Sequence, residues 1–171
     1  MSTATLTLLA GPSGCGKTRL AKQRWPNTQP TCPEDIRRLI VDDASTRDAG
    51  TEAYSTARSI AETRLQRGWP TVFDATSLQR RDLKWAQAAA ARNNATVHLV
   101  IVRATFNQCK AGWQQRARSR QQTLPADLDV FLGRQIAATE RLIDAINSGR
   151  IAHDFDHVEI VDRTHHAAAR P

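Results

Sequence analysis

The stretch that decides the fold is Gly11-Pro-Ser-Gly-Cys-Gly-Lys17-Thr18, which directly follows the apolar run of residues 6–10. It has the spacing G-x-x-x-x-G-K-[ST] in the required context, between a short strand and a helix. Its glycines let the backbone curl so that successive N–H groups point inward at phosphate oxygens, which a Cβ would obstruct. We therefore expect this segment to bind a nucleoside triphosphate.

The residues of this loop have separate expected roles in binding ATP and Mg²⁺. The helix that begins near Gly16 adds the positive end of its dipole to the backbone N–H groups. Lys17 can reach the terminal phosphates and act in catalysis, and the Thr18 hydroxyl can complete the ligand shell of a magnesium ion. The expected nucleotide-binding residues of the loop are Gly11, Ser13, Gly14, Cys15, Gly16, Lys17 and Thr18.

Length and composition are those of one soluble globular domain. The chain has 171 residues, of which 40% are hydrophobic and 24% charged, and no apolar run is long enough to span a bilayer. The start of the chain enters a strand at once, which leaves no room for a signal peptide. The three cysteines lack metal-ligand spacing, so we expect a reducing cytoplasmic setting with no membrane partner.

The net charge of +7 is unevenly distributed. Residues 83–126 contain no Asp or Glu and carry seven basic side chains, namely Lys84, Arg92, Arg103, Lys110, Arg116, Arg118 and Arg120. Such a basic surface attracts polyanions, so it predicts a nucleic acid, DNA or RNA, as partner and substrate. The alternative is a solvated surface together with phosphate ligands for the nucleotide itself.

The hydrophobic pattern predicts an α/β P-loop kinase fold, a three-layer αβα sandwich around a five-stranded parallel sheet. We expect one kinase domain over residues 1–163, a short tail at 164–171, and a mobile Arg-rich lid at the polar, aperiodic segment 116–124. The expected strands are residues 5–10, 28–32, 71–74, 97–102 and 158–161; the expected helices are 16–24, one from Pro33, 52–67, 79–92, 106–115 and 125–147.

The residues around this fold favour a kinase over a hydrolase. An ATPase motor usually needs an acid beside its magnesium-site Asp, yet Val72-Phe-Asp74-Ala-Thr76 has no adjacent Glu. A GTPase would need an Asn-Lys-x-Asp segment, and no asparagine here precedes a lysine. Acids at a helix start, a buried Asp74 that could hold magnesium through water, and a mobile basic lid are instead the parts of a phosphotransferase that acts on an alcohol.

The acids Glu34 and Asp35 lie at the start of the helix that Pro33 begins. The helix dipole favours acids there without any catalysis, and both can pair with Arg37 or Arg38 at i,i+3 or i,i+4 spacing. Their spacing alone therefore fits a structural role as well as a catalytic one.

Five segments taken together resemble a known family over about residues 5 to 162. These are the loop at 11–18, the acid-x-x-Arg helix start at 34–38 with Asp42-Asp43 after it, Gly68 leading into residues 72–76, and the basic stretch 116–120 before Leu124-Pro125. They resemble the kinase domain of the polynucleotide 5′-hydroxyl kinase family, within the zeta-toxin-like P-loop kinases. The resemblance implies an ATP-dependent kinase that phosphorylates the 5′-hydroxyl end of DNA or RNA.

In that family the first acid is the general base, the Arg after it contacts the acceptor phosphate, and a lid Arg contacts the donor phosphates. Counting back from Asp42 gives Glu34 with Arg37, whereas residue identity favours Asp35 with Arg38, so both pairs stay open. Asp74 is expected near the acceptor and the metal. The lid candidates are Arg116 and Arg120 as catalytic residues and Arg118 as a nucleotide contact.

Other activities stay open at this stage. One is a DNA kinase for a hydroxymethylated base, a second is a small-molecule phosphotransferase, and a third is a non-catalytic nucleotide-binding or nucleic-acid-binding module. A homo-oligomer also stays open.

Overall fold

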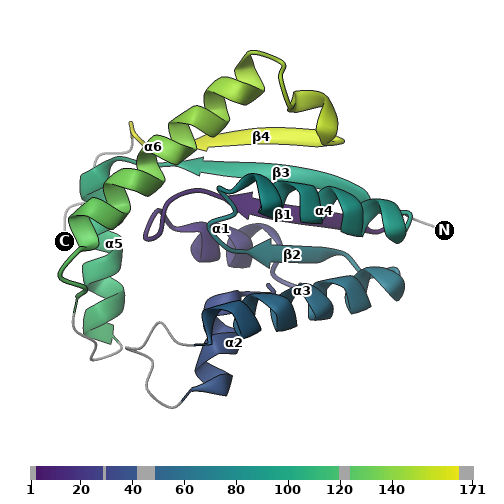
Figure 1. Ribbon diagram of the computed structural model, residues 1–171, viewed down its shortest axis with the longest axis horizontal. Coiled ribbons are helices and arrows are strands. Elements are labelled where there is room, and N and C mark those ends of the chain that lie inside the picture. The colour runs from purple at the N-terminus through teal and green to yellow at the C-terminus, as the bar shows by residue number, and fades with distance from the viewer. Residues whose placement is uncertain (1–2, 29, 42–48, 120–123, 166–171) are drawn as a thin grey trace.

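The computed structural model of the protein describes residues 3–28, 30–41, 49–119 and 124–165. Its centre is a parallel sheet in the order β2-β1-β3-β4 (Figure 1). The strands are β1 (Thr5–Ala10), β2 (Thr71–Asp74), β3 (Thr96–Arg103) and β4 (His157–Asp162). Because all four run parallel, their carboxyl ends meet at one edge of the sheet, where ligands of open α/β sheets bind.

The expected fifth strand at residues 28–32 is wrong for the described part of the chain. That segment contributes only an isolated parallel bridge between Thr31 and Phe73. Two backbone hydrogen bonds hold it there, from the Thr31 N–H to Val72 at 2.8 Å and from the Asp74 N–H to Thr31 at 3.0 Å. Pro30 lacks a donor for the ladder and Pro33 begins a helix, so pairing cannot extend in either direction.

Within the described residues, six helices cover both faces of the sheet, as the hydrophobic pattern predicts. They are α1 (Lys17–Arg24), α2 (Pro33–Ile40), α3 (Gly50–Gln66), α4 (Arg80–Arg92), α5 (Phe106–Ser119) and α6 (Leu128–Asn147), and a 3₁₀ turn (Ala152–Asp154) precedes β4.

Alternate side chains of each strand enter two separate hydrophobic clusters. Leu6 and Leu8 of β1 pack with residues of α3 and α4, whereas Leu9 packs with residues of α1 and α5. Helix α6 joins both clusters, through Ile143 on the first face and Leu132 on the second. Every residue of β2 is buried, as expected for a parallel strand covered on both faces.

The expected lid loop at 116–124 is also wrong where the structure describes it. Helix α5 continues through Ser119, four residues beyond the expected end at 115. Ala117 is buried in this last turn, and the Ser119 hydroxyl donates to the Arg116 carbonyl at 2.9 Å. Residues 120–123 lie outside the described part, and α6 begins at Leu128 rather than at 125.

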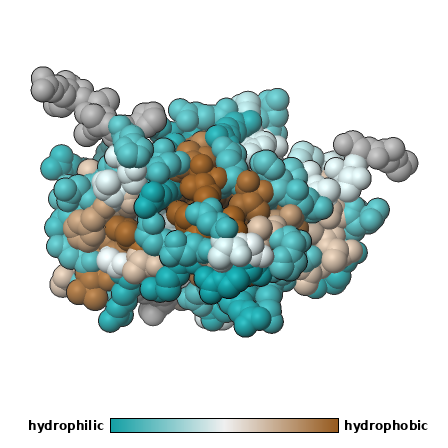
Figure 2. Space-filling model, turned by 90° about the horizontal axis from the view of Figure 1, so that it is seen from above, coloured by the Kyte–Doolittle hydropathy of each residue, from teal (hydrophilic) through white to brown (hydrophobic). Residues whose placement is uncertain are grey.

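Strand β4 pairs with β3 and forms one edge of the described sheet. Its residues are exposed or partly exposed. Figure 2 views the molecule from above. On the surface seen there, apolar side chains gather near the centre and polar ones surround them. Among the described residues, no helix is both long and apolar enough to cross a membrane.

Candidate active site

The loop between β1 and α1 has the backbone shape of a phosphate cradle. Gly14 and Gly16 adopt the left-handed φ values of 84° and 93°, which favour glycine. Lys17 as a whole is 8% exposed, and its ammonium donates to the carbonyls of Gly11 and Pro12 at 2.9 and 2.8 Å. The lysine is therefore held at the loop by neutral acceptors that can exchange for phosphate oxygens.

Helix α5 packs so closely on this loop that glycine is required on both sides. A Cβ at Gly112 would lie 2.2 Å from the Gly14 carbonyl oxygen, and a Cβ at Gly14 would lie 2.2 Å from the Cys109 carbonyl oxygen. Gly112 was not predicted as a site residue. The sequence does hold one signal for it: glycine inside a helix lowers helix stability by about 1 kcal/mol relative to alanine, so a glycine retained there indicates close packing.

Thr18 and Asp74 meet at the carboxyl ends of β1 and β2. The Thr18 hydroxyl donates to Asp74 Oδ2 at 2.6 Å. Burial raises the pKa of the Asp74 carboxyl, and the Asp35 carboxylate adds to the rise, while the Thr18 hydrogen bond, Lys17 and Arg116 oppose it. Two adjacent oxygen ligands beside a phosphate cradle fit magnesium, which binds through one or two protein oxygens and phosphates.

The two acids of α2 line the cleft and have different interaction partners. Glu34 accepts from Arg116 Nη1 at 3.0 Å, and both Glu34 and Asp35 lie 3.6 Å from the Arg38 guanidinium. The negative charge of Asp35 acts on Asp74 and also on Cys32, whose pKa rises to about 12, first because of its burial. The charge of Asp35 thus acts on Asp74, the expected metal ligand, whereas Glu34 is bonded to Arg116 of α5.

Of the three expected lid arginines, the described part of the chain brings only Arg116 into the cleft. Its guanidinium lies over the Trp113 ring, 5.5 Å from the centroid, and reaches Glu34 on the other side. Arg118 is exposed and does not line the cleft. Arg120 lies outside the described residues.

One cleft of about 1350 Å³ contains nearly all of these groups. The cradle from Ser13 to Thr18 lines it, together with Asp74 and Arg116. Toward α2 and α3 its lining includes Glu34, Asp35, Arg37, Arg38, Tyr54 and Gln79; toward β4 it includes Arg19, Lys22, Gln108, Asp162 and Arg163. Gly11 does not line the cleft but donates its N–H to the Thr76 carbonyl at 2.9 Å.

Two long-range contacts of the cradle were not predicted from the sequence. Gln135 of α6 accepts from the Ser13 N–H at 2.7 Å. Arg163, directly after β4, donates to the Cys15 carbonyl at 3.2 Å and lies where a Cβ of Gly16 would be. Both side chains join the cradle over more than 100 residues of sequence, so no local pattern could have indicated them.

The acid-free stretch 83–126 is not the unpaired basic surface that its composition predicts. Acids from other elements neutralise four of its seven cations. The pairs are Arg92–Glu62 at 2.9 Å, Arg103–Glu140 at 2.8 Å, Lys110–Asp129 at 2.9 Å and Arg116–Glu34 at 3.0 Å.

A family comparison covers most of this architecture. The model of the AAA_33 family, described as an AAA domain, matches residues 6–142. The chain belongs to this family. The AAA_33 match runs from β1 into α6 and so includes the cradle, both acids of α2 and Asp74. No curated protein matches the chain.

Solved structures share the fold at low sequence identity. A Chloroflexus aurantiacus protein, provisionally assigned as a kinase, aligns with a TM-score of 0.71 at 17% identity over 96% of this chain and 88% of its own. A chain of the Pnkp1/Rnl/Hen1 RNA repair complex aligns at 0.70 and 13%, over 84% of this chain and 46% of its own. A chain of the PezAT toxin–antitoxin system of Streptococcus pneumoniae aligns at 0.68 and 17%, over 95% and 69%. The AAA_33 chain therefore has the P-loop kinase fold.

Proposed function

We propose that the protein is an ATP-dependent kinase that transfers the γ-phosphate to the hydroxyl at the 5′ end of DNA or RNA. The observation that carries the proposal is one cleft lined by a phosphate cradle with Lys17, by the Thr18–Asp74 pair and by the acids of α2. A cradle alone would suit any nucleotide-binding protein. Acids across from it supply a proton acceptor, which transfer to an alcohol needs.

On the donor side, the backbone N–H groups of residues 13–18 would hold the phosphates, and Lys17 would move from its two carbonyl partners to the β- and γ-phosphates. Thr18 and Asp74 would hold Mg²⁺, which when bound neutralises charge on the phosphates. Arg163 and Arg19 line the cleft beyond the cradle, toward β4, where they can contact the rest of the nucleotide.

On the acceptor side, we assign the general base to Asp35. Its charge acts on Asp74, while Glu34 is already bonded to Arg116. The substrate oxygen forms a bond to the γ-phosphorus as the bond to the β,γ-bridging oxygen breaks, and Asp35 takes the hydroxyl proton. The products are ADP and a phosphate monoester. Arg116 would compensate the charge that develops on the transferred group.

Two arginines beside the base favour an acceptor that carries its own phosphate. Arg37 and Arg38 line the same end of the cleft as Asp35, and guanidinium groups bind phosphate oxygens in bidentate geometry. The 5′-terminal nucleotide of a nucleic acid has a phosphate on its 3′ side, which Arg38 could contact. The fold shared with a chain of an RNA repair complex also supports this acceptor class.

An acceptor screen with γ-labelled ATP tests the proposal. The acceptors are 5′-hydroxyl oligonucleotides of DNA and RNA, duplexes with a hydroxymethylated base, and free sugars and nucleosides. We expect label on the 5′-hydroxyl oligonucleotides, and none with Lys17→Ala, which loses the phosphate contact. Label only on sugars, nucleosides or modified bases would contradict the proposed acceptor. ATP binding without any transfer would contradict a kinase.

A further inference from the structure

Four cations near the mouth of the cleft have no acid partner among the described residues. Arg80, Arg81 and Lys84 lie in the first two turns of α4, and Arg134 lies in α6; all four are exposed. Unlike Arg103, Lys110 and Arg116, none of them forms an ion pair within the described ranges. The positive charge of these four side chains therefore remains available on the two helices, and three of them lie outside the acid-free stretch 83–126.

The basic side chains in the first turns of α4 destabilise that end of the helix. The first turn of a helix favours acids because of the dipole, yet α4 begins with two arginines. Lys84 is four residues from Arg80 and three from Arg81, so like charges share one face. The one acid of this turn, Asp82, is buried and bonded to Arg58 at 2.8 Å. An anionic ligand would offset the repulsion that remains.

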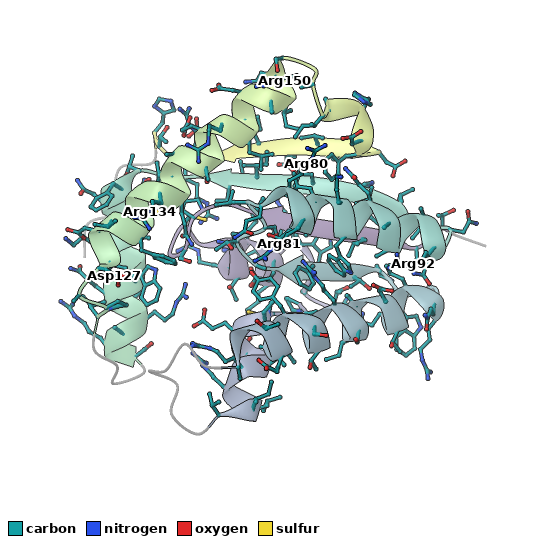
Figure 3. The ribbon with its side chains drawn as sticks, in the orientation of Figure 1. Arg80, Arg81, Arg92, Asp127, Arg134 and Arg150 are labelled. Carbon is teal, nitrogen blue, oxygen red and sulfur yellow. The ribbon has the colours of Figure 1, made fainter. Side chains whose placement is uncertain are left out.

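Arg80 and Arg134 do not line the cleft themselves but are adjacent in sequence to residues that do. Gln79, directly before Arg80, and Gln135, directly after Arg134, both line it. Figure 3 shows Arg81 at the end of α4 that faces Arg134, whereas Arg150 lies at the opposite end of α6.

We propose that Arg80, Arg81 and Arg134 bind backbone phosphates of the acceptor strand beyond its terminal nucleotide. This inference rests on the proposed function and specifies its substrate as a polynucleotide, held without regard to base sequence. Phosphate contacts of this kind contribute affinity and positioning but read no bases. Arg37 and Arg38 would serve the first phosphate, and the three outer arginines would serve later ones.

The test compares Arg80→Ala/Arg81→Ala/Arg134→Ala with Arg150→Ala, a charge removal far from the cleft. One readout is the KM for a single-stranded 5′-hydroxyl oligonucleotide divided by the KM for a nucleoside 3′-phosphate. We expect this ratio to rise about tenfold in the triple variant and to stay at the wild-type value in the control. A second readout is oligonucleotide binding measured by fluorescence anisotropy as a function of salt, which needs no catalysis. Its slope of log K against log [salt] should fall by about 2, since each contact to a single strand contributes about 0.7.

The outcomes separate this inference from the proposed function. If the triple variant binds the oligonucleotide with wild-type affinity and salt slope, the inference is overturned whatever the enzyme phosphorylates. If binding weakens as expected but no nucleic acid receives label, the surface is supported and the proposed kinase activity fails.

Discussion

At the scale of single residues, two substitutions in α2 decide which acid takes the proton. Asp35→Asn should lower kcat by about 10²- to 10⁴-fold, the usual contribution of a general base, with ATP affinity unchanged. Glu34→Gln should have a smaller effect, because it weakens contacts such as those to Arg116 and Arg38 without removing the general base. Single-turnover transfer and ATP titration measure both quantities. A larger loss in Glu34→Gln than in Asp35→Asn would assign the base to Glu34.

Asp74 is the residue at which we expect function to cost stability. Burial gives this carboxyl a pKa above its ordinary value in the folded state, so the native protein binds that proton more tightly than the unfolded chain. The free energy of unfolding therefore falls as pH rises through this pKa, and the ionised carboxylate is a net cost at neutral pH. Asn at this position can still accept from Thr18 without carrying the charge.

We accordingly expect Asp74→Asn to be more stable than the wild type at pH 7.5 without ligand, and to lose magnesium-dependent transfer. The stability gain should shrink as the pH is lowered from 7.5 toward this raised pKa, because the wild-type carboxyl then takes up its proton. Urea unfolding at pH 7.5 and at lower pH measures the difference. A variant less stable than wild type at pH 7.5, or a gain that does not change with pH, would show that burial is not the dominant effect on Asp74.

At the scale of elements, the contact of α5 with the phosphate cradle depends on Gly112. Gly112→Ala would place a Cβ 2.2 Å from the Gly14 carbonyl oxygen, so helix or loop must move. ATP affinity should fall at least tenfold, or about 1.4 kcal/mol. Gly133→Ala is the matched control in α6, where a Cβ meets nothing within 4 Å. It should leave ATP affinity unchanged and stabilise the fold by about 0.5–1 kcal/mol. Calorimetric titration with ATP checks both, and wild-type affinity in Gly112→Ala would refute the steric argument.

The elements that sequence could predict are those whose signals are local. The cradle, the strand that ends at Asp74 and the start of α2 at Pro33 each follow from a few adjacent residues. The end of α5 could not be predicted in this way, because its polar last turn is fixed by the burial of Ala117 in the tertiary fold. The bridge at Thr31 is a similar case, since two prolines reduce an extended segment to a single pair of contacts with β2.

At the scale of the whole molecule, composition predicted the amount of positive charge but not its place. Residues 83–126 are rich in cations, yet their partners Glu62, Glu140, Asp129 and Glu34 come from other parts of the chain. Only the folded structure reveals which cations keep their charge available. The contacts of Gln135 and Arg163 with the cradle depend in the same way on folding, because they join residues 122 and 148 positions apart.

In the proposed reaction, the cleft joins a triphosphate donor to the 5′ end of a nucleic acid. The most direct measurement is to incubate the enzyme with γ-labelled ATP and a 5′-hydroxyl oligonucleotide, and to digest the product to single nucleotides. The account predicts that all label lies in the 5′-phosphate of the terminal nucleotide, and that Asp35→Asn and Lys17→Ala yield almost none. Label on an internal base, or release of free phosphate with none on the strand, would contradict it.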